Sequence, residues 1–243
     1  ASQKGGVGKT ATTVNLAACL AVAGKRTLLI DMDPQASATT HLGVEGEHDS
    51  SVYELLRGTH SLNTVTQFVN PRLYLVPSQR EVGQIELLLA KNTGSDRMQI
   101  LKSKILGAAD YDFIVIDTPP NLGFLTINAM VAADTVIVPV PTEFYGLKGL
   151  AMIMDLARAI TEDLNPSLKL KYLLTMHDRR TKMGREVIGK VRELLGEDVY
   201  QAVIPRTVKL AEAPRHGKPI CLLDPTSPGA KAYAKLAREV SGR

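Results

Sequence analysis

The chain has 243 residues, of which 44% are hydrophobic and 22% charged, a composition typical of a globular protein with a sizeable core. No apolar run approaches the roughly 20 residues of a membrane span and no secretory leader is visible, so an embedded or exported protein is not expected. The net charge of +4 is uneven, because residues 179–218 hold ten basic and five acidic side chains, which indicates a local face for a polyanion.

A phosphate-binding loop stands almost at the start, as Lys4-Gly5-Gly6-Val7-Gly8-Lys9-Thr10. In the pattern G-x-x-x-x-G-K-[ST], backbone N–H groups surround phosphate oxygens, the lysine supplies a positive charge and the hydroxyl reaches Mg²⁺. Gln3 replaces the first glycine, and Lys4 is an extra lysine that the general motif does not require. The loop predicts nucleotide binding by Gly5, Gly6, Val7, Gly8, Lys9, Thr10 and Ala11. Since only three residues precede Lys4, we expect the strand that feeds the loop to be missing or cut.

Helices and strands alternate after the loop. The spacing of Val14, Ala17, Ala18 and Ala21 predicts a helix that ends before Gly24. Continuous apolar runs separated by amphipathic helices predict an α/β fold: a mostly parallel, doubly wound sheet with helices on both faces, in a single P-loop NTPase domain over residues 1–243. The predicted strands are 27–30, 73–76, 113–116, 135–140, 170–175 and 199–204. Helical patterns include Leu147, Leu150, Ala151 and Met154, and near the end Ala230, Tyr233, Ala234 and Ala237, while residues 43–70 are expected to form short helices and loops.

Acidic residues follow two of these strands. Asp31 and Asp33 come after the first predicted strand, at the carboxyl end where open α/β sheets bind ligands. Asp33 is a candidate for orienting an attacking water, and Asp31 for supporting the Mg²⁺ shell or neighbouring loops. Asp117 ends the apolar run Phe113–Ile116 and is the natural Walker B carboxylate. An acid after one strand is often only a helix cap or a solvated turn, but these acids behind a Gly-Lys-Thr loop favour a metal-dependent ATPase.

Together these segments resemble the ParA/MinD superfamily of deviant Walker A ATPases, and specifically its ParA, or Soj-type, partition proteins. The resemblance also includes residues 139–146 and 204–214, so it covers nearly the whole chain. It implies a dimer that closes face to face around two ATP molecules, with Lys4 reaching the partner's phosphate. It further implies that Lys9 contacts the β- and γ-phosphates and that Asp33 holds the catalytic water. The Mg²⁺ site implied by the resemblance consists of Thr10, Asp33 and Asp117. The segment implied to lie near the adenine is Pro205, Arg206 and Thr207.

The same resemblance implies partners and a place in the cell. Family members bind nonspecific double-stranded DNA as ATP dimers, release it on hydrolysis, and are stimulated by a ParB-like centromere-binding protein. Slow basal turnover and a cytoplasmic, nucleoid-associated location are therefore expected. Charge runs on helices are usually solvated faces, but the family's use of this region favours DNA contacts here. The candidates are Arg179, Arg180, Lys182, Arg185, Arg206, Lys209 and Arg215.

Several relatives with a similar loop fit less well. A guanine-specific protein would carry a lysine in the segment Thr175-Met176-His177-Asp178, and a nitrogenase-reductase-like protein would need differently placed cysteines than Cys19 and Cys221. Those two cysteines have no metal-like spacing and are expected to be buried structural thiols. A MinD-like membrane-cycling ATPase and a non-catalytic nucleotide-gated scaffold stay open as alternatives. The small alanine face of residues 229–243 argues against a stable membrane anchor, and Asp33 against the scaffold.

Overall fold

The structure, a computed structural model, describes residues 6–44, 50–89, 95–143 and 150–242. The strands are β1 (Thr27–Asp31), β2 (Gln67–Asn70), β3 (Leu73–Val76), β4 (Phe113–Asp117), β5 (Thr135–Pro141), β6 (Lys169–His177) and β7 (Val199–Pro205). The helices are α1 (Lys9–Val22), α2 (Ser37–His41), α3 (Val52–Arg57), α4 (Leu62–Val65), α5 (Ile85–Leu89), α6 (Ile100–Ile105), α7 (Phe124–Ala132), α8 (Leu150–Asp163), α9 (Lys182–Leu195), α10 (Val208–Glu212), α11 (Ile220–Leu223) and α12 (Pro228–Val240), with 3₁₀ turns η1 (Arg80–Gln84), η2 (Ser95–Gln99), η3 (Gly196–Asp198) and η4 (Ala213–His216).

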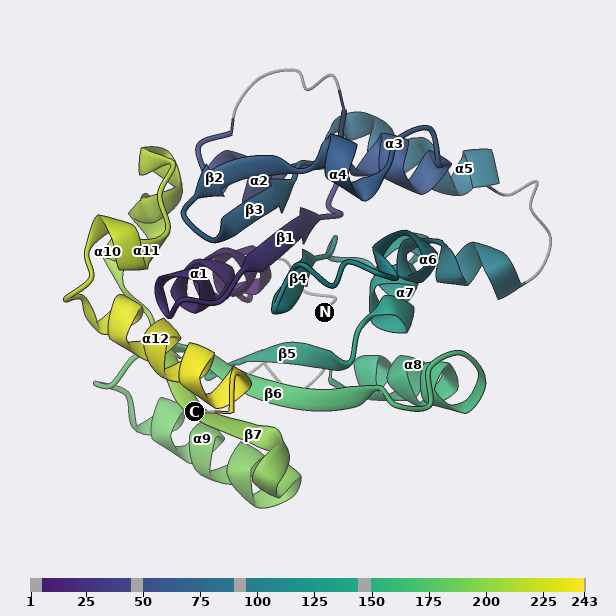
Figure 1. Ribbon diagram of the computed structural model, residues 1–243. Helices are drawn as coiled ribbons and strands as arrows, with labels where there is room; N and C mark the ends of the chain where they lie inside the picture. The colour runs from purple at the N-terminus through teal and green to yellow at the C-terminus, as the bar shows by residue number, and fades with distance from the viewer. Residues whose placement is uncertain (1–5, 45–49, 90–94, 144–149, 243) are drawn as a thin grey trace.

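The strands form two sheets that lie edge to edge (Figure 1). The first has the order β2-β3-β1-β4 and the second the order β5-β6-β7. Every pairing is parallel except that of β2 with β3, which is antiparallel. The predicted α/β P-loop fold with a mostly parallel sheet is confirmed, and the six predicted strands agree with β1 and β3–β7 to within two residues at each end.

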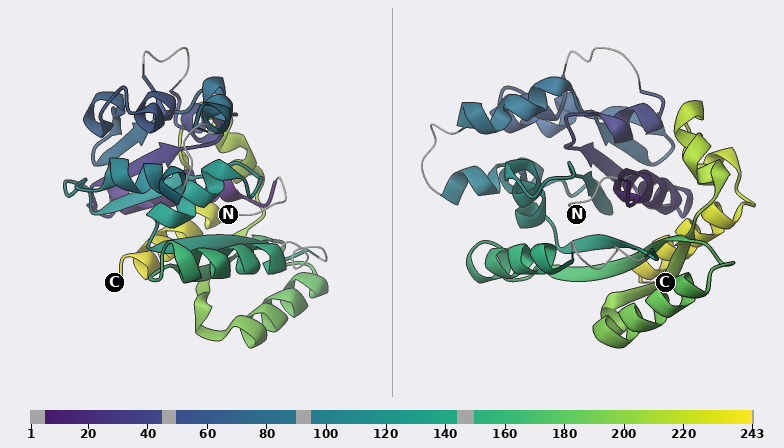
Figure 2. Two further views of the ribbon diagram at one scale, coloured as in Figure 1. Left: turned by 90° about the vertical axis from the view of Figure 1, so that its right-hand side faces the viewer. Right: turned by 180° about the vertical axis from the view of Figure 1, so that it is seen from behind.

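Helices cover both faces of this arrangement, as the two views of Figure 2 show. Successive residues of β1 point to opposite faces, so Leu28 packs with α3, α6 and α7 whereas Leu29 packs against α1. The helices α7, α8 and α9 cover one face of the second sheet, while α1 and α12 cover the other. Because both faces are buried, continuous apolar strands are what the fold requires.

Between the two sheets, the edges of β4 and β5 line a cavity of about 800 Å³. No strand of the described residues lies between them, and a parallel strand there would join the two sheets into one. The strand predicted ahead of the loop would come before Gly6, outside the described residues. The cavity runs along β4 and β5 and meets the loop region at Lys9, Thr13 and Asp117.

Three details differ from the sequence-based expectation. Residues 67–70 form the short edge strand β2, where only loops and helices were expected. In α8 the buried residues are Ile153, Ala157 and Ile160, whereas Ala151 and Met154 are exposed, because the helix turns a different face to the core; Leu147 lies outside the described residues. In α12, Ala234 is exposed, because the buried face follows the larger Tyr233 and Leu236. None of the described helices is long and apolar enough to cross a bilayer.

Candidate functional site

The phosphate loop owes its shape to two glycines. Gly6 has φ 77° and Gly8 has φ 91°, left-handed values that a residue with a Cβ rarely adopts. A Cβ at either position would meet nothing within 4 Å, so the backbone angle and not a lack of room requires glycine. The Thr175 hydroxyl, at the end of β6, donates to the Val7 carbonyl at 3.0 Å. The loop is therefore fastened to the carboxyl edge of the second sheet.

Helix α1 begins directly after the loop, at Lys9. Its N-cap is Gly8, no described side chain caps its first N–H groups, and its first turn holds no acid. The start of a helix presents backbone N–H groups and a positive dipole end, which together form a site for an anion such as phosphate. Burial lowers the pKa of Lys9, and the negative charges of Asp117 and Asp33 oppose this effect. The structure thus brings Lys9 and both predicted acids together at the start of α1.

Asp117 is almost completely buried, with 1% of its surface exposed. Its Oδ1 accepts a hydrogen bond of 3.1 Å from the Thr13 hydroxyl, while its buried Oδ2 has no partner among the described residues. Burial raises the pKa of Asp117, and the nearby Thr10 and Thr13 hydroxyls lower it. A buried, orphaned carboxylate oxygen beside a threonine hydroxyl fits Mg²⁺, which takes one or two carboxylates together with phosphates and waters.

Asp31 has a supporting position in the structure. Its Oδ1 accepts from the Asp33 N–H at 3.1 Å, and its Oδ2 accepts from both the N–H and the hydroxyl of Thr39 at 2.8 Å. The same Thr39 hydroxyl accepts from the Ser78 N–H. Of the two roles expected for Asp31, these contacts favour support of the neighbouring loops. Asp33 itself is 8% exposed and its Oδ1 accepts from the Gln35 N–H, so its turn is fixed on both sides.

Asp31 makes stability depend on pH. Burial, and the charge of Asp117, its register partner on β4, raise the pKa of Asp31 to about 7. Between the unfolded value near 4 and pH 7 the folded state holds a proton that the unfolded state lacks, so the free energy of unfolding falls as pH rises. Over about three pKa units the fall contributed by Asp31 is at most about 4 kcal/mol. Urea unfolding at pH 5 and pH 8 measures this difference in the free energy of unfolding. The difference should be smaller for Asp31→Asn than for wild type, and equal differences would contradict a raised pKa of Asp31.

The predicted adenine segment follows β7. Pro205 ends the strand as the register partner of His177, the Arg206 N–H donates to the His177 carbonyl, and the Thr207 hydroxyl caps α10. Since β7 lies beside β6, this segment is at the same sheet edge as the loop. The Arg206 guanidinium forms an ion pair with Glu143 at 3.3 Å.

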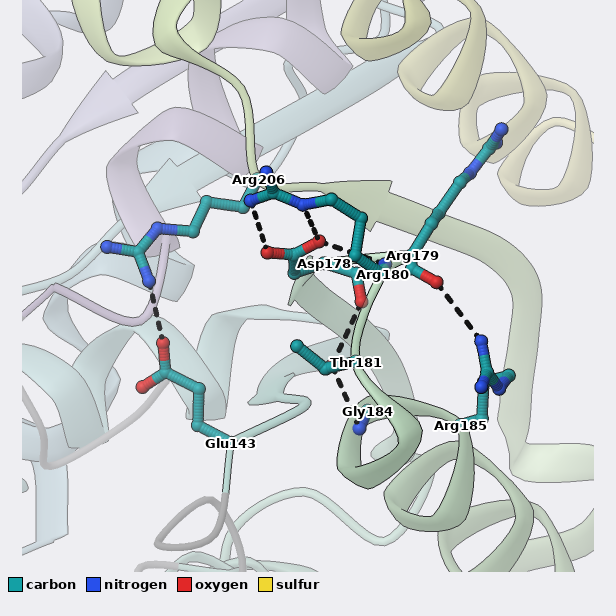
Figure 3. A network of polar contacts seen from close by, with 8 residues as sticks. All are labelled: Glu143, Asp178, Arg179, Arg180, Thr181, Gly184, Arg185 and Arg206. Atoms are coloured by element: carbon teal, nitrogen blue, oxygen red, sulfur yellow. Dashed lines mark hydrogen bonds and ion pairs between the residues drawn. The ribbon is translucent and has the colours of Figure 1, made fainter.

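The basic residues fall into two groups in the structure. Arg179 and Arg180 precede α9 in the turn after β6, and Figure 3 shows them with Arg185 and Arg206 around Asp178. Asp178 binds the Arg180 guanidinium twice, at 3.0 and 2.8 Å, and Arg185 donates to the Arg179 carbonyl. Lys182 lies in the first turn of α9 and pairs with Glu186. Lys209 lies on α10 and pairs with Asp224, and Arg215 lies on η4. Figure 1 shows α10 apart from α9.

Sequence reasoning missed several residues of this site. Thr13 lies three residues after Thr10, so helical spacing could have placed its hydroxyl beside Asp117. Thr175 and Thr39 had no local signal, because their partners are far away in the sequence. Lys4 and Gly5 lie outside the described residues.

Known proteins similar to this chain agree on the family. A family model described as an AAA domain matches residues 1–170. The chain is 43% identical to the sporulation initiation inhibitor protein Soj of Bacillus subtilis, over 99% of this chain and 96% of that protein. It is 44% identical to the chromosome-partitioning ATPase Soj of Thermus thermophilus, over 100% of this chain and 94% of that one. The chain belongs to the Soj/ParA family of chromosome-partitioning ATPases.

A solved structure with bound nucleotide has the same fold as this chain. Cobyrinic acid a,c-diamide synthase from Mycobacterium smegmatis, with bound ADP and magnesium, is 32% identical, with a TM-score of 0.86 over 100% of this chain and 94% of that one. As a member of a family of ATPases, the chain is an ATPase, as the sequence predicted.

Proposed function

We propose that the chain is an Mg²⁺-dependent partition ATPase in which bound ATP closes a dimer that binds DNA. The observation that carries the nucleotide part is Asp117, whose buried Oδ2 lacks a described partner beside the Lys9–Thr10 start of α1. Thr10 and Asp117 would hold Mg²⁺, directly or through water, which when bound with ATP neutralises charge on the β- and γ-phosphates. Lys9 and the N–H groups of the loop bind the phosphates themselves.

Asp33 is proposed to orient the attacking water. It is only slightly exposed, near Lys9 and Asp117, and its turn is held by Asp31 and by the Gln35 N–H. A carboxylate that accepts hydrogen bonds only through one oxygen keeps the other available for a water proton. Pro205, Arg206 and Thr207 are proposed to border the adenine, at the same sheet edge as the loop.

ATP is proposed to act as a dimerisation switch through Lys4. A γ-phosphate brings negative charge to the open face of each subunit, and a lysine supplied by the other subunit favours closure only when that charge is present. A cation delivered across an interface can change phosphoryl transfer by roughly 10³–10⁵ in arginine-finger systems. A lysine that is already in place in the resting dimer should accelerate hydrolysis less than this. We therefore expect slow basal turnover, which a ParB-like partner stimulates.

The DNA face is proposed to centre on Arg179. In Figure 3 its side chain points away from the paired groups, and no partner for its guanidinium is found among the described residues. The neighbouring arginines are partly neutralised, because Asp178 holds Arg180 and Glu143 holds Arg206. Burial lowers the pKa of His177, and the positive charges of Arg179 and Arg185 lower it further. This turn therefore offers positive charge to DNA phosphates. Contacts with phosphates do not depend on base sequence, so nonspecific binding to nucleoid DNA is part of the proposal.

The DNA face is tested by its salt dependence. Each neutralised phosphate contributes about −0.9 to the slope of log K against log salt, so losing one contact per subunit of a dimer should flatten the slope by about two units. We expect this for Arg179→Ala, measured by fluorescence anisotropy with two unrelated duplexes in Mg-ATP. Arg158→Ala on α8 is the matched control, because Arg158 is also exposed. If the two variants have the same slope as wild type, Arg179 is not a DNA contact.

A MinD-like membrane cycle is the second candidate, but α12 is not available as its membrane-binding helix. The buried residues of α12, among them Tyr233 and Leu236, pack against α1 and β7, and the Tyr233 hydroxyl lies 3.4 Å from the Thr12 hydroxyl. An apolar face already used inside the fold is not available to a bilayer.

A further inference from the structure

Two cysteines that are far apart in the sequence meet beside the phosphate-loop helix. Cys19 lies on α1 with 5% of its surface exposed, and Cys221 lies half-buried on α11 against the same apolar cluster. The Asn15 side chain, one helical turn before Cys19, accepts a hydrogen bond of 2.7 Å from the Ile220 N–H, directly before Cys221. This buried bond fixes the start of α11 on α1 and sets the two thiols against each other.

The two thiols lie close enough to affect each other's pKa. The Cys19 thiol lowers the pKa of Cys221, and the N–H groups of Cys221 and Leu222 lower it further. The neighbouring Cys221 thiol, together with burial, raises the pKa of Cys19. Cys221 is thus both the more accessible and the more acidic thiol. In a reactive pair these are the properties of the attacking cysteine, and Cys19 is placed as the resolving one.

We propose that Cys19 and Cys221 form a reversible intramolecular disulfide that ties α1 to α11. The oxidant is a small-molecule disulfide such as oxidised glutathione. The Cys221 thiolate attacks one sulfur and releases one glutathione thiolate, which takes up a proton. The Cys19 thiol then loses its proton, attacks the Cys221 sulfur of the mixed disulfide and releases the second glutathione. Two protein thiols are oxidised and one glutathione disulfide is reduced to two thiols.

The position of this bond connects it with the nucleotide switch. Helix α1 carries Lys9 and Thr10 at its start, and α11 follows the segment that holds Arg206, Lys209 and Arg215. A cross-link between residues 19 and 221 also closes a loop over most of the chain, which restricts the unfolded state. The oxidised protein should therefore unfold at a higher temperature, and dithiothreitol should reverse the rise.

The test is oxidation of the folded chain with oxidised glutathione, followed by intact mass and non-reducing peptide mapping. For wild type we expect the loss of two hydrogen atoms, a peptide pair joined through Cys19 and Cys221, and a raised melting temperature. Cys19→Ala should stop at a glutathione adduct on Cys221, and Cys221→Ala should stay unmodified because Cys19 is buried. Two results with the wild-type protein alone would overturn the proposal. One is a glutathione adduct that stays on the protein, and the other is a pair of thiols that react with an alkylating reagent only after the protein is unfolded.

Discussion

Replacing Asp33 by alanine should lower ATP hydrolysis by about 10²-fold or more while leaving Mg-ATP binding within a few-fold of wild type, because a positioned acid–base group contributes about 10²–10⁴. Asp33 follows β1, and Asp31 holds its backbone N–H, so most of the turn stays in place without its carboxylate. Phosphate release at saturating ATP measures the loss, and calorimetry with Mg-ATP measures the retained affinity.

The charge of Asp33 can be separated from its turn. The Oδ1 of Asp33 accepts from the Gln35 N–H, and Asn at this position preserves that acceptor while removing the negative charge. Asp33→Asn should therefore fold like wild type and lose turnover like Asp33→Ala. Turnover within threefold of wild type in both variants would show that the water is oriented by another group.

Replacing Lys9 by alanine should weaken ATP binding by about 100-fold, because charge-assisted hydrogen bonds contribute up to about 3 kcal/mol and each factor of ten is 1.4 kcal/mol. Burial lowers the pKa of Lys9, which means that burying this cation costs free energy. Removing the charge should therefore not lower the melting temperature of the protein without nucleotide. Calorimetry with ATP and a thermal melt without nucleotide measure the two effects.

The matched control is Lys231→Ala, which removes an exposed lysine from α12 and should change neither quantity. Wild-type ATP affinity in Lys9→Ala would contradict the assignment of the loop. A large loss of melting temperature without nucleotide would instead make Lys9 a structural residue.

Much of the fold was predictable because continuous apolar runs favour interior strands. Leu28–Ile30 is fully buried in β1, Phe113–Ile116 is half-buried in β4, and both strands lie where the sequence placed them. The edge strand β2 was missed, because it is short, its end residues Gln67 and Asn70 are polar and its partner strand β3 is not visible from the local pattern. The buried face of α8 was misplaced, because several apolar residues of this helix are exposed.

The site was predictable where the chemistry lies in consecutive residues. The loop glycines, Lys9, Thr10 and the acids after β1 and β4 follow motif spacing, and the structure brings those of them that it describes to one edge. Contacts between distant segments had no such signal. Neither the Thr39 support of Asp31 nor the approach of Cys19 to Cys221 can be seen before α2 and α11 are placed.

Light scattering of the Asp33→Ala protein shows whether ATP switches the chain from a monomer to a dimer. With hydrolysis blocked, the molar mass in Mg-ATP should be twice the mass in Mg-ADP. Adding Lys4→Ala to this variant should keep ATP bound but return the mass to that of the monomer, because the charge that crosses between subunits is gone. Equal masses in ATP and ADP, or a full dimer without Lys4, would contradict the account.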